Sequence, residues 1–136
     1  MKKIITLSLC FLALALVMGC IDNKSENSKV KLITAEEMQK ILELEDAQLV
    51  DVRTEREYEE SHILNSQNID YNSPTFEEDI AKLDKEKPVI LYCKGGSRSA
   101  KCAKKLEDAG FEKIYDLDGG ISKWKHTNKL KLEVKS

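Results

Sequence analysis

The sequence predicts an α/β fold with a mostly parallel central sheet of about five strands and helices on both faces. Short apolar runs alternate along the chain with segments whose apolar residues recur at helical spacing. The runs are continuous rather than alternating, which is typical of strands that are buried on both faces of a parallel sheet. With 136 residues, 41% of them hydrophobic and 34% charged, the chain has the size and composition of one globular domain.

A first helix is expected over residues 35–44. Thr34 stands three positions before Glu37, which is the pattern of a capping box, in which two side chains satisfy free N–H groups at a helix N-terminus. The apolar residues that follow recur at helical spacing and form one face; they are Met38, Ile41 and Leu42.

A buried strand is expected over residues 48–52, where a short apolar run ends beside charged residues. Thr54 and Glu57 repeat the capping-box pattern directly after this run. The sequence therefore predicts a short, highly charged helix that ends near Glu60.

The rest of the chain continues the alternation of strands and helices. Pro74 precedes a helix, Gly110 ends another, and Gly119 with Gly120 marks a tight turn. The predicted elements are a strand at 67–70, a helix at 75–83, a strand at 89–92, a helix at 99–108, a strand at 113–116 and a helix at 121–126.

Charge and cysteine content exclude several classes of protein. The 22 basic and 24 acidic residues give a formal net charge of -2, so the chain lacks the basic excess that nucleic-acid binding requires. Only Cys93 and Cys102 of the four cysteines lie in the predicted domain, which is too few for a disulfide framework. No His and Cys spacing predicts a metal site. We expect a monomer without a metal or a cofactor.

The first residues have the order of a signal peptide. Lys2 and Lys3 precede an uncharged apolar run at 4–17, and the small Gly19 and then Cys20 close the segment. The run has 14 residues, too few to span a hydrocarbon core of about 30 Å at about 1.5 Å per residue. We therefore expect a signal peptide rather than a membrane-spanning anchor.

The end of this segment, residues 16–20, resembles the lipobox of bacterial-type lipoproteins, whose cysteine is lipidated and becomes the new N-terminus. The resemblance implies a signal peptide at 1–19, a lipid on Cys20, a flexible polar tether at 20–30 and a domain at 31–136. The protein would be exported and held at the membrane by its lipid on the extracytoplasmic face. Alternatively, Cys20 follows a simple cleavage site and carries no lipid.

The segment from Val89 to Ser99 carries the strongest signal for chemistry. Cys93 leaves the C-terminal end of a predicted buried strand, Gly95 and Gly96 let backbone N–H groups turn inward, and a helix N-terminus follows. Convergent N–H groups and the positive end of a helix stabilise negative charge at the centre of such a loop. This environment lowers a cysteine pKa from about 8.5 to about 3.5–7.5. Cys93 is therefore predicted to be a reactive nucleophile.

At these residues the chain resembles the rhodanese, or sulfurtransferase, family in its single-domain form, and the resemblance extends over residues 31–128. Further segments match the family's motifs in order; they are Leu49-Val-Asp-Val-Arg53, Glu57-Tyr58, Ser61-His62-Ile63, Asn68-Ile69, and Asp118-Gly119-Gly120 with Trp124. The chain departs from the family pattern at Ser61 and Asn65, where glycine is common, and at Asp70, where proline is frequent. These departures affect a connecting segment rather than the loop around Cys93.

The resemblance implies a two-step sulfur transfer. The Cys93 thiolate attacks the outer sulfur of an anionic donor such as thiosulfate, sulfite departs, and the Cys93 persulfide passes its sulfur to a thiol or cyanide acceptor. The persulfide and the donor would be bound by the loop residues Lys94, Gly95, Gly96, Ser97 and Arg98. Alternatively, a rhodanese-like carrier or binding module takes a persulfide from a partner and has little turnover of its own.

Loop length disfavours a phosphatase. Four residues separate Cys93 from Arg98, whereas phosphatases that share the cysteine, the anion cradle and the arginine carry five and so admit a tetrahedral phosphate. The shorter loop suits a sulfur atom. A thiol redox protein that uses Cys93 and Cys102 is a third hypothesis, although Cys102 is expected to be a buried residue of the following helix.

Several side chains near the loop are expected to support it. Asp51 and Arg53 are expected to pair with neighbours such as Glu57 and to hold loops in place, and in the family His62 belongs to a structural connection. Trp124 is expected to anchor the segment after the double glycine. The lysines of the following helix either extend a positive approach to Cys93 or form a solvated face; they are Lys101, Lys104 and Lys105.

Overall fold

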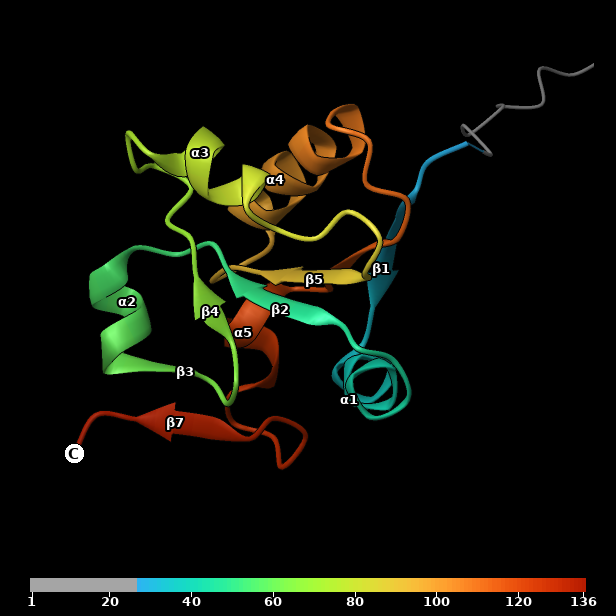
Figure 1. Ribbon diagram of the computed structural model, residues 1–136. Helices are drawn as coiled ribbons and strands as arrows, with labels where there is room; N and C mark the ends of the chain where they lie inside the picture. The colour runs from blue at the N-terminus through green and yellow to red at the C-terminus, as the bar shows by residue number, and fades with distance from the viewer. Residues whose placement is uncertain (1–26) are drawn as a thin grey trace, which may run out of the picture.

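The structure, a computed structural model, describes residues 27–136. The predicted signal peptide, Cys20 and most of the predicted tether lie outside the described residues. Within residues 27–136 no helix combines the length and hydropathy that crossing a bilayer requires. The described part is built on a five-stranded sheet with helices on both faces (Figure 1), which confirms the predicted fold class.

Every pairing in the five-stranded sheet is parallel. The strands are β1 (Val30–Ile33), β2 (Gln48–Asp51), β4 (Gln67–Asn68), β5 (Val89–Tyr92) and β6 (Ile114–Leu117), and their spatial order is β1-β6-β5-β2-β4. β5 is the middle strand, and all of its residues are buried. Because both faces of the sheet are covered, side chains on both sides of β5 are buried, and the strand is a continuous apolar run.

Helices cover the sheet on both sides (Figure 1). On one side lie α3 (Phe76–Ala81) and α4 (Ser97–Asp108), and on the other lie α1 (Ala35–Leu44) and α5 (Gly120–Trp124). Successive residues of β5 face opposite sides, since Leu91 belongs to the apolar cluster under α3 and α4 and Tyr92 to the cluster with α1. Cys93 follows β5 directly and lies in the same cluster as Leu91.

Both predicted capping boxes are formed. The Thr34 hydroxyl accepts a hydrogen bond from the Glu37 N–H at 3.2 Å, and the Thr54 hydroxyl accepts one from the Glu57 N–H at 3.3 Å. Each glutamate carboxylate accepts a hydrogen bond from the threonine N–H in return. These boxes fix the starts of α1 and of α2 (Glu55–Glu60).

Three short strands are not predicted by the sequence. They are β1 and the two strands of a small antiparallel sheet, β3 (Ser61–Ile63) and β7 (Leu132–Val134). β1 begins at Val30, one residue before the predicted domain boundary at residue 31.

The boundaries of the other elements differ only slightly from the predictions. α4 begins at Ser97 rather than at residue 99, because Gly96 has a left-handed backbone with φ of 107° and turns the chain directly into the helix. The remaining helices and strands agree with the predicted ranges to within about two residues at each end.

Candidate active site

Cys93 lies where the central strand β5 passes into the loop before α4. Its sulfur accepts a hydrogen bond from the Gly96 N–H at 3.1 Å and lies 3.5 Å from the Ser99 hydroxyl. The residue is 1% exposed. Around it, Lys94, Gly95 and Ser97 are exposed, so the loop encloses the sulfur and turns the remaining side chains outward.

The hydrogen bonds around Cys93 favour its thiolate. Burial by itself raises the pKa of the thiol, but the Ser99 hydroxyl and the backbone N–H groups of Ser99, Gly96 and Gly95 outweigh burial and hold the pKa below its ordinary value. This is the anion cradle that the glycine-containing loop predicts. The arrangement can stabilise a sulfur anion at the end of β5.

The first turn of α5 holds the outer side of this loop. The Ile121 N–H donates to the Cys93 carbonyl at 2.9 Å, and the Ser122 N–H donates to the Lys94 carbonyl at 3.0 Å. Gly120 makes the close approach possible, because a Cβ at this position would lie 2.5 Å from the Cys93 carbonyl oxygen. N–H groups of α5 therefore bind two carbonyl groups of the loop. The N–H group of Gly96 in the loop faces the sulfur.

Arg98 is bound by Glu57, which corrects the expected partner of this glutamate. The Arg98 guanidinium donates to both carboxylate oxygens of Glu57, at 2.7 and 3.0 Å. The hydrogen bonds from Arg98 are the main reason that the pKa of Glu57 is lowered to about 2, with burial opposing them and Thr54 adding to them. The positive charge of Arg98 is therefore largely balanced within the protein before any anion binds.

Asp51 and Arg53 bind each other rather than Glu57. Arg53 donates to Asp51 through Nη2 at 2.6 Å and through Nε at 3.0 Å, and both residues are buried. Arg53 Nη2 also donates to the Ser61 carbonyl at 2.7 Å, and the Asn68 amide donates to the carbonyls of Asp51 and Arg53. Such a pair can hold the ends of β2, β3 and β4 together.

His62 contributes to the small sheet of β3 and β7 and makes no hydrogen bond with Cys93. Its ring stacks on Tyr58 with ring centroids 3.8 Å apart, and its Nδ1 lies 2.9 Å from the Tyr58 carbonyl. Its Nε2 lies 3.2 Å from a carboxylate oxygen of Glu133 on β7. These contacts join α2, β3 and β7, as a structural residue would.

The lysines near the loop differ in their partners. Lys104 lies 3.5 Å from Asp108, and Lys105 binds Glu77, so these two belong to a paired helix surface. Lys94 is exposed and has no ion-pair partner within residues 27–136.

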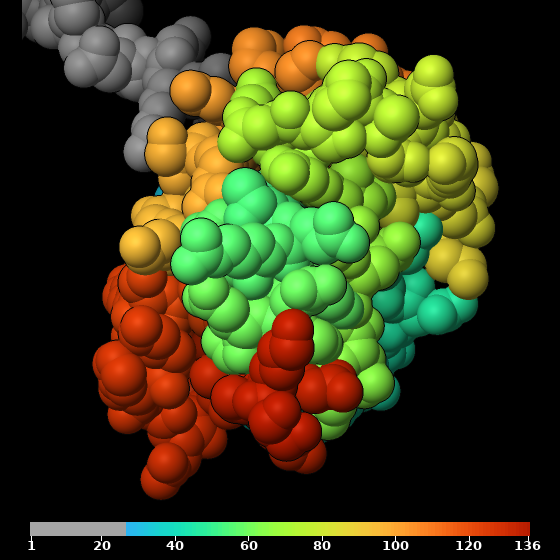
Figure 2. Space-filling model, turned by 90° about the vertical axis from the view of Figure 1, so that its left-hand side faces the viewer, coloured from blue at the N-terminus to red at the C-terminus, as the bar shows by residue number. Residues whose placement is uncertain are grey.

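A depression of about 190 Å³ lies beside Lys94, between α2 and α5. Its lining includes Glu57, Glu60, Lys94, Ser122 and Lys125. Figure 2 shows this side of the molecule, where α2 (green) borders the C-terminal segment (red).

Cys102 and Trp124 occupy positions that suit packing. Cys102 is fully buried, and burial raises the pKa of its thiol to about 12. Both Cys93 and Cys102 are free thiols. Trp124 donates from its indole N–H to the Asp118 carbonyl at 2.7 Å, which fixes the segment after the double glycine.

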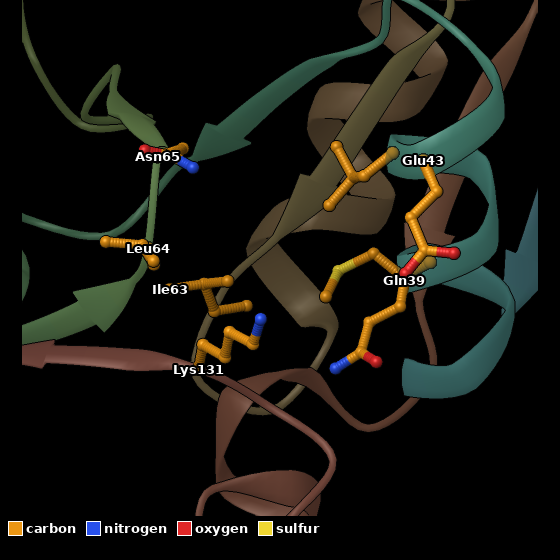
Figure 3. A pocket seen from close by; sticks show the side chains of 8 residues that line it. Gln39, Glu43, Ile63, Leu64, Asn65 and Lys131 are labelled. Atoms are coloured by element: carbon orange, nitrogen blue, oxygen red, sulfur yellow. The ribbon is translucent and has the colours of Figure 1, made fainter.

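A second hollow, of about 250 Å³, lies between α1 and the segment that follows β3 (Figure 3). Gln39 and Glu43 of α1 line it on one side, and Ile63 and Lys131 line it on the other. It contains no cysteine. Residues 27–136 also contain no group of three His, Cys, Asp or Glu side chains placed to hold a metal ion.

Sequence reasoning did not identify Asp116 of β6, whose side chain is buried under α4. The residue is 2% exposed, and its Oδ1 has no hydrogen-bond partner among residues 27–136. The only signal in the sequence is an acidic residue inside a strand that is otherwise apolar or aromatic.

Comparison with known proteins agrees with this geometry. The family model described as "Rhodanese-like domain" matches residues 34–127. The chain is 37% identical over 95 residues to the thiosulfate sulfurtransferase GlpE of Coxiella burnetii, and the match covers 70% of this chain and 87% of that protein. It is 38% identical over 105 residues to the tRNA uridine(34) hydroxylase of Hamiltonella defensa; the match covers 73% of this chain but only 29% of the hydroxylase.

A solved structure shows the same fold. The rhodanese-like domain protein of Staphylococcus aureus superposes with a TM-score of 0.65 at 33% identity, and the match covers 78% of this chain and 99% of that one. The family match spans the loop from Cys93 to Arg98, the strands that position it and the double glycine that holds it. Fold, motif order and sequence identity thus agree, and the chain belongs to the family of rhodanese-like domains.

Proposed function

We propose that the protein is a sulfurtransferase that carries sulfane sulfur as a persulfide on Cys93. The observation that carries the proposal is the Gly96 N–H that donates to the Cys93 sulfur at 3.1 Å, in a loop that lowers the pKa of this thiol. A sulfur that backbone N–H groups hold as an anion can attack a donor without a general base. The likeness to a thiosulfate sulfurtransferase supports this assignment.

The proposed reaction has two steps. The Cys93 thiolate attacks the outer sulfur of thiosulfate, the bond between the two sulfur atoms of thiosulfate breaks, and sulfite leaves with the bonding electron pair. The resulting Cys93 persulfide anion occupies the same N–H cradle. Cyanide or a thiolate then takes the outer sulfur, which gives thiocyanate or a new persulfide and returns the Cys93 thiolate.

Lys94 is proposed to attract the anionic donor. It is exposed and unpaired within residues 27–136, and it follows the nucleophile directly. Arg98 contributes less net charge than the sequence suggests, because Glu57 already binds its guanidinium. The backbone N–H groups of the loop are proposed to bind the persulfide.

Incubation of the full-length protein with thiosulfate and cyanide tests this function. Formation of thiocyanate is expected for the parent and for Cys102→Ala, which removes the other thiol of the described domain. Cys93→Ser should lose activity by several orders of magnitude because a serine hydroxyl cannot form the persulfide. Activity of Cys93→Ser equal to that of the parent would refute the proposed nucleophile.

A persulfide carrier with little turnover is a second candidate function. The specific observation in its favour is the 1% exposure of Cys93, since an enclosed persulfide is shielded from water and from small acceptors. Intact-protein mass spectrometry after treatment with thiosulfate separates the two functions. One stable added sulfur together with negligible thiocyanate formation supports the carrier, whereas rapid loss of the sulfur to cyanide supports the enzyme.

We further propose that the protein is exported by a signal peptide at 1–19 and anchored at the extracytoplasmic face of a membrane by a lipid on Cys20. This proposal rests on the order of basic, apolar and small residues that ends at Cys20. Labelled palmitate should enter the parent and Cys10→Ala but not Cys20→Ala. Incorporation into Cys20→Ala would contradict the lipid anchor.

A further inference from the structure

Within residues 27–136, the carboxyl of Asp116 is buried and has no ion-pair partner. Asp116 is 2% exposed, and its Oδ1 has no hydrogen-bond partner among residues 27–136. Asp51 is equally buried but accepts hydrogen bonds from Arg53 on both of its carboxylate oxygens. Burying a carboxylate without a partner costs free energy. The ion pair with Arg53 offsets this cost for Asp51, but no such pair offsets it for Asp116.

Asp116 lies on the same side of the sheet as Cys93. Asp116 is paired in register with Leu91, and Leu91 and Cys93 belong to the cluster under α4. Ser99, in the first turn of α4, is fully buried beside both groups. Its hydroxyl oxygen lies 3.5 Å from the Cys93 sulfur and donates to the Gly96 carbonyl at 3.2 Å. One hydroxyl group therefore lies within reach of both the sulfur and the carboxyl.

The surroundings of Asp116 favour its protonated form. Burial raises the pKa of Asp116 to about 6, the Ser99 hydroxyl opposes this rise, and Asp118 adds to it. The Ser99 hydroxyl donates to the Gly96 carbonyl, so Asp116 Oδ1 has no hydrogen-bond donor within residues 27–136.

No group on the elements packed against β6 supplies a compensating charge within residues 27–136. β5 carries no charged residue, and α4 presents the buried thiol of Cys102. Lysines on the packed elements have other partners: Lys105 of α4 binds Glu77, Lys31 of β1 lies 3.5 Å from Glu37, and Lys123 of α5 binds Asp118.

We propose that Asp116 is a positioning residue that acts on the Cys93 sulfur through Ser99, an inference that rests on the proposed role of Cys93 as the nucleophile. When Asp116 is protonated, its carboxyl donates to the Ser99 hydroxyl oxygen, and the Ser99 hydroxyl turns from the Gly96 carbonyl to donate to the sulfur, which stabilises the thiolate or the persulfide anion. When Asp116 releases its proton to solvent, the carboxylate competes for the Ser99 hydroxyl, and its charge opposes the thiolate. Asp116 thereby adjusts the reactivity of Cys93.

The rate of Cys93 alkylation by iodoacetamide as a function of pH tests the proposal. The full-length protein is used, and the alkylated cysteine is identified by peptide mass spectrometry. Asp116→Asn should lower the midpoint of the profile by about 0.5–1 pH unit and remove the inflection near the Asp116 pKa. Asp118→Asn, which removes the same charge two residues along the chain, should shift the midpoint by less than about 0.2 unit. Equal shifts in the two variants, or none in Asp116→Asn, would overturn the proposal.

The role of Ser99 is tested by a double-mutant cycle. Ser99→Ala should raise the midpoint of the alkylation profile, because the sulfur anion loses a donor. Asp116→Asn should then shift the midpoint less in the Ser99→Ala background than in the parent. Full additivity of the two shifts would contradict an effect that passes through Ser99.

A second measurement applies even if Asp116→Asn does not fold. The Asp116 carboxyl is titrated by carbon-13 NMR in the parent and in Cys93→Ser. Because coupling is reciprocal, the midpoint of Asp116 should be lower in Cys93→Ser, where no thiolate opposes ionisation. An unchanged midpoint would refute the coupling. Neither readout depends on sulfur transfer, so a protein that shows the coupling but forms no thiocyanate would disprove only the proposed function.

Discussion

The guanidinium of Arg98 makes two hydrogen bonds with the carboxylate of Glu57, at 2.7 and 3.0 Å, across 41 positions of sequence. This pair ties α2 to the loop around Cys93. It also fixes a cation of the candidate site in place and balances its charge.

Replacement of Glu57 by Gln should lower the free energy of unfolding by roughly 1–2 kcal/mol at pH 7. The pKa of Glu57 is about 2 in the folded protein, below its ordinary value of 4.5. A depressed carboxyl pKa stabilises the fold fully above pH 4.5, and this contribution is lost as the pH falls towards 2. Urea unfolding at pH 7 and pH 2.5 should therefore show a larger difference between parent and variant at pH 7.

Glu60→Gln is the matched control for this experiment. Glu60 is also on α2, but it is exposed and its partner Arg56 is exposed as well, with 3.3 Å between them. This variant should change stability by less than about 0.5 kcal/mol at either pH. A loss in Glu57→Gln of the same size at both pH values would argue against the ionised pair.

Lys94→Gln should raise the KM for thiosulfate by about two- to tenfold with a smaller change in kcat, because the donor loses the exposed cation that directly follows the nucleophile in the chain. Added salt should raise the KM of the parent more than that of the variant. The control is Lys101→Gln, which removes an exposed lysine of α4 and should leave the KM unchanged. Equal effects of the two substitutions would indicate a general field rather than a specific contact.

Gly120→Ala should reduce thiocyanate formation more than about tenfold, because the added Cβ displaces the backbone of the loop. At this position a Cβ would lie 2.5 Å from the Cys93 carbonyl oxygen and 2.6 Å from the Lys94 carbonyl carbon. Gly110→Ala is the control, since Gly110 also has a positive φ, of 95°, but nothing lies within 4 Å of an added Cβ. It should cost about 1 kcal/mol of stability and leave activity intact. Unchanged turnover in Gly120→Ala would show that the loop tolerates this displacement.

Tyr92→Phe should lower the free energy of unfolding by about 1–3 kcal/mol, measured by urea denaturation. The Tyr92 hydroxyl accepts a hydrogen bond from the Ile63 N–H at 3.0 Å and lies 3.0 Å from the Ser66 hydroxyl, and Tyr92 is fully buried. Removing the Tyr92 hydroxyl leaves the buried Ile63 N–H without a hydrogen-bond partner. Tyr71→Phe should be nearly neutral, since the half-buried Tyr71 ring packs on Phe76 and its hydroxyl makes no side-chain hydrogen bond within residues 27–136. Similar losses in both variants would contradict this explanation.

The sequence predicts those parts of the fold whose causes are local. The two capping-box patterns predict the starts of α1 and α2, and the continuous apolar run of β5 predicts a buried central strand. β3 and β7 carry no such signal, because a strand of three residues such as Leu132–Val134 exists only through its pairing with a partner far away in the sequence. β1 likewise gains its place through its parallel pairing with β6.

The candidate site shows the same division. The loop from Cys93 to Arg98 is recognisable because the cysteine, the glycines and the helix start are neighbours in the sequence. The partner of Glu57 is not recognisable, since the sequence favours a neighbour such as Arg53, whereas the fold brings in Arg98 from 41 positions away. Asp116 was overlooked because nothing in the spacing of β6 shows that its side chain is buried beside Ser99.

The contacts between α5 and the loop around Cys93 can form only after α5 has been synthesised. The carbonyl groups of Cys93 and Lys94 are bound by the N–H groups of Ile121 and Ser122, which are made later than the loop as the chain is synthesised. A chain that stops before Gly119 would contain the cysteine but not the two N–H groups that bind the loop carbonyls. Thiol reactivity measured on nascent or truncated forms would therefore report whether these two contacts are needed to hold the loop.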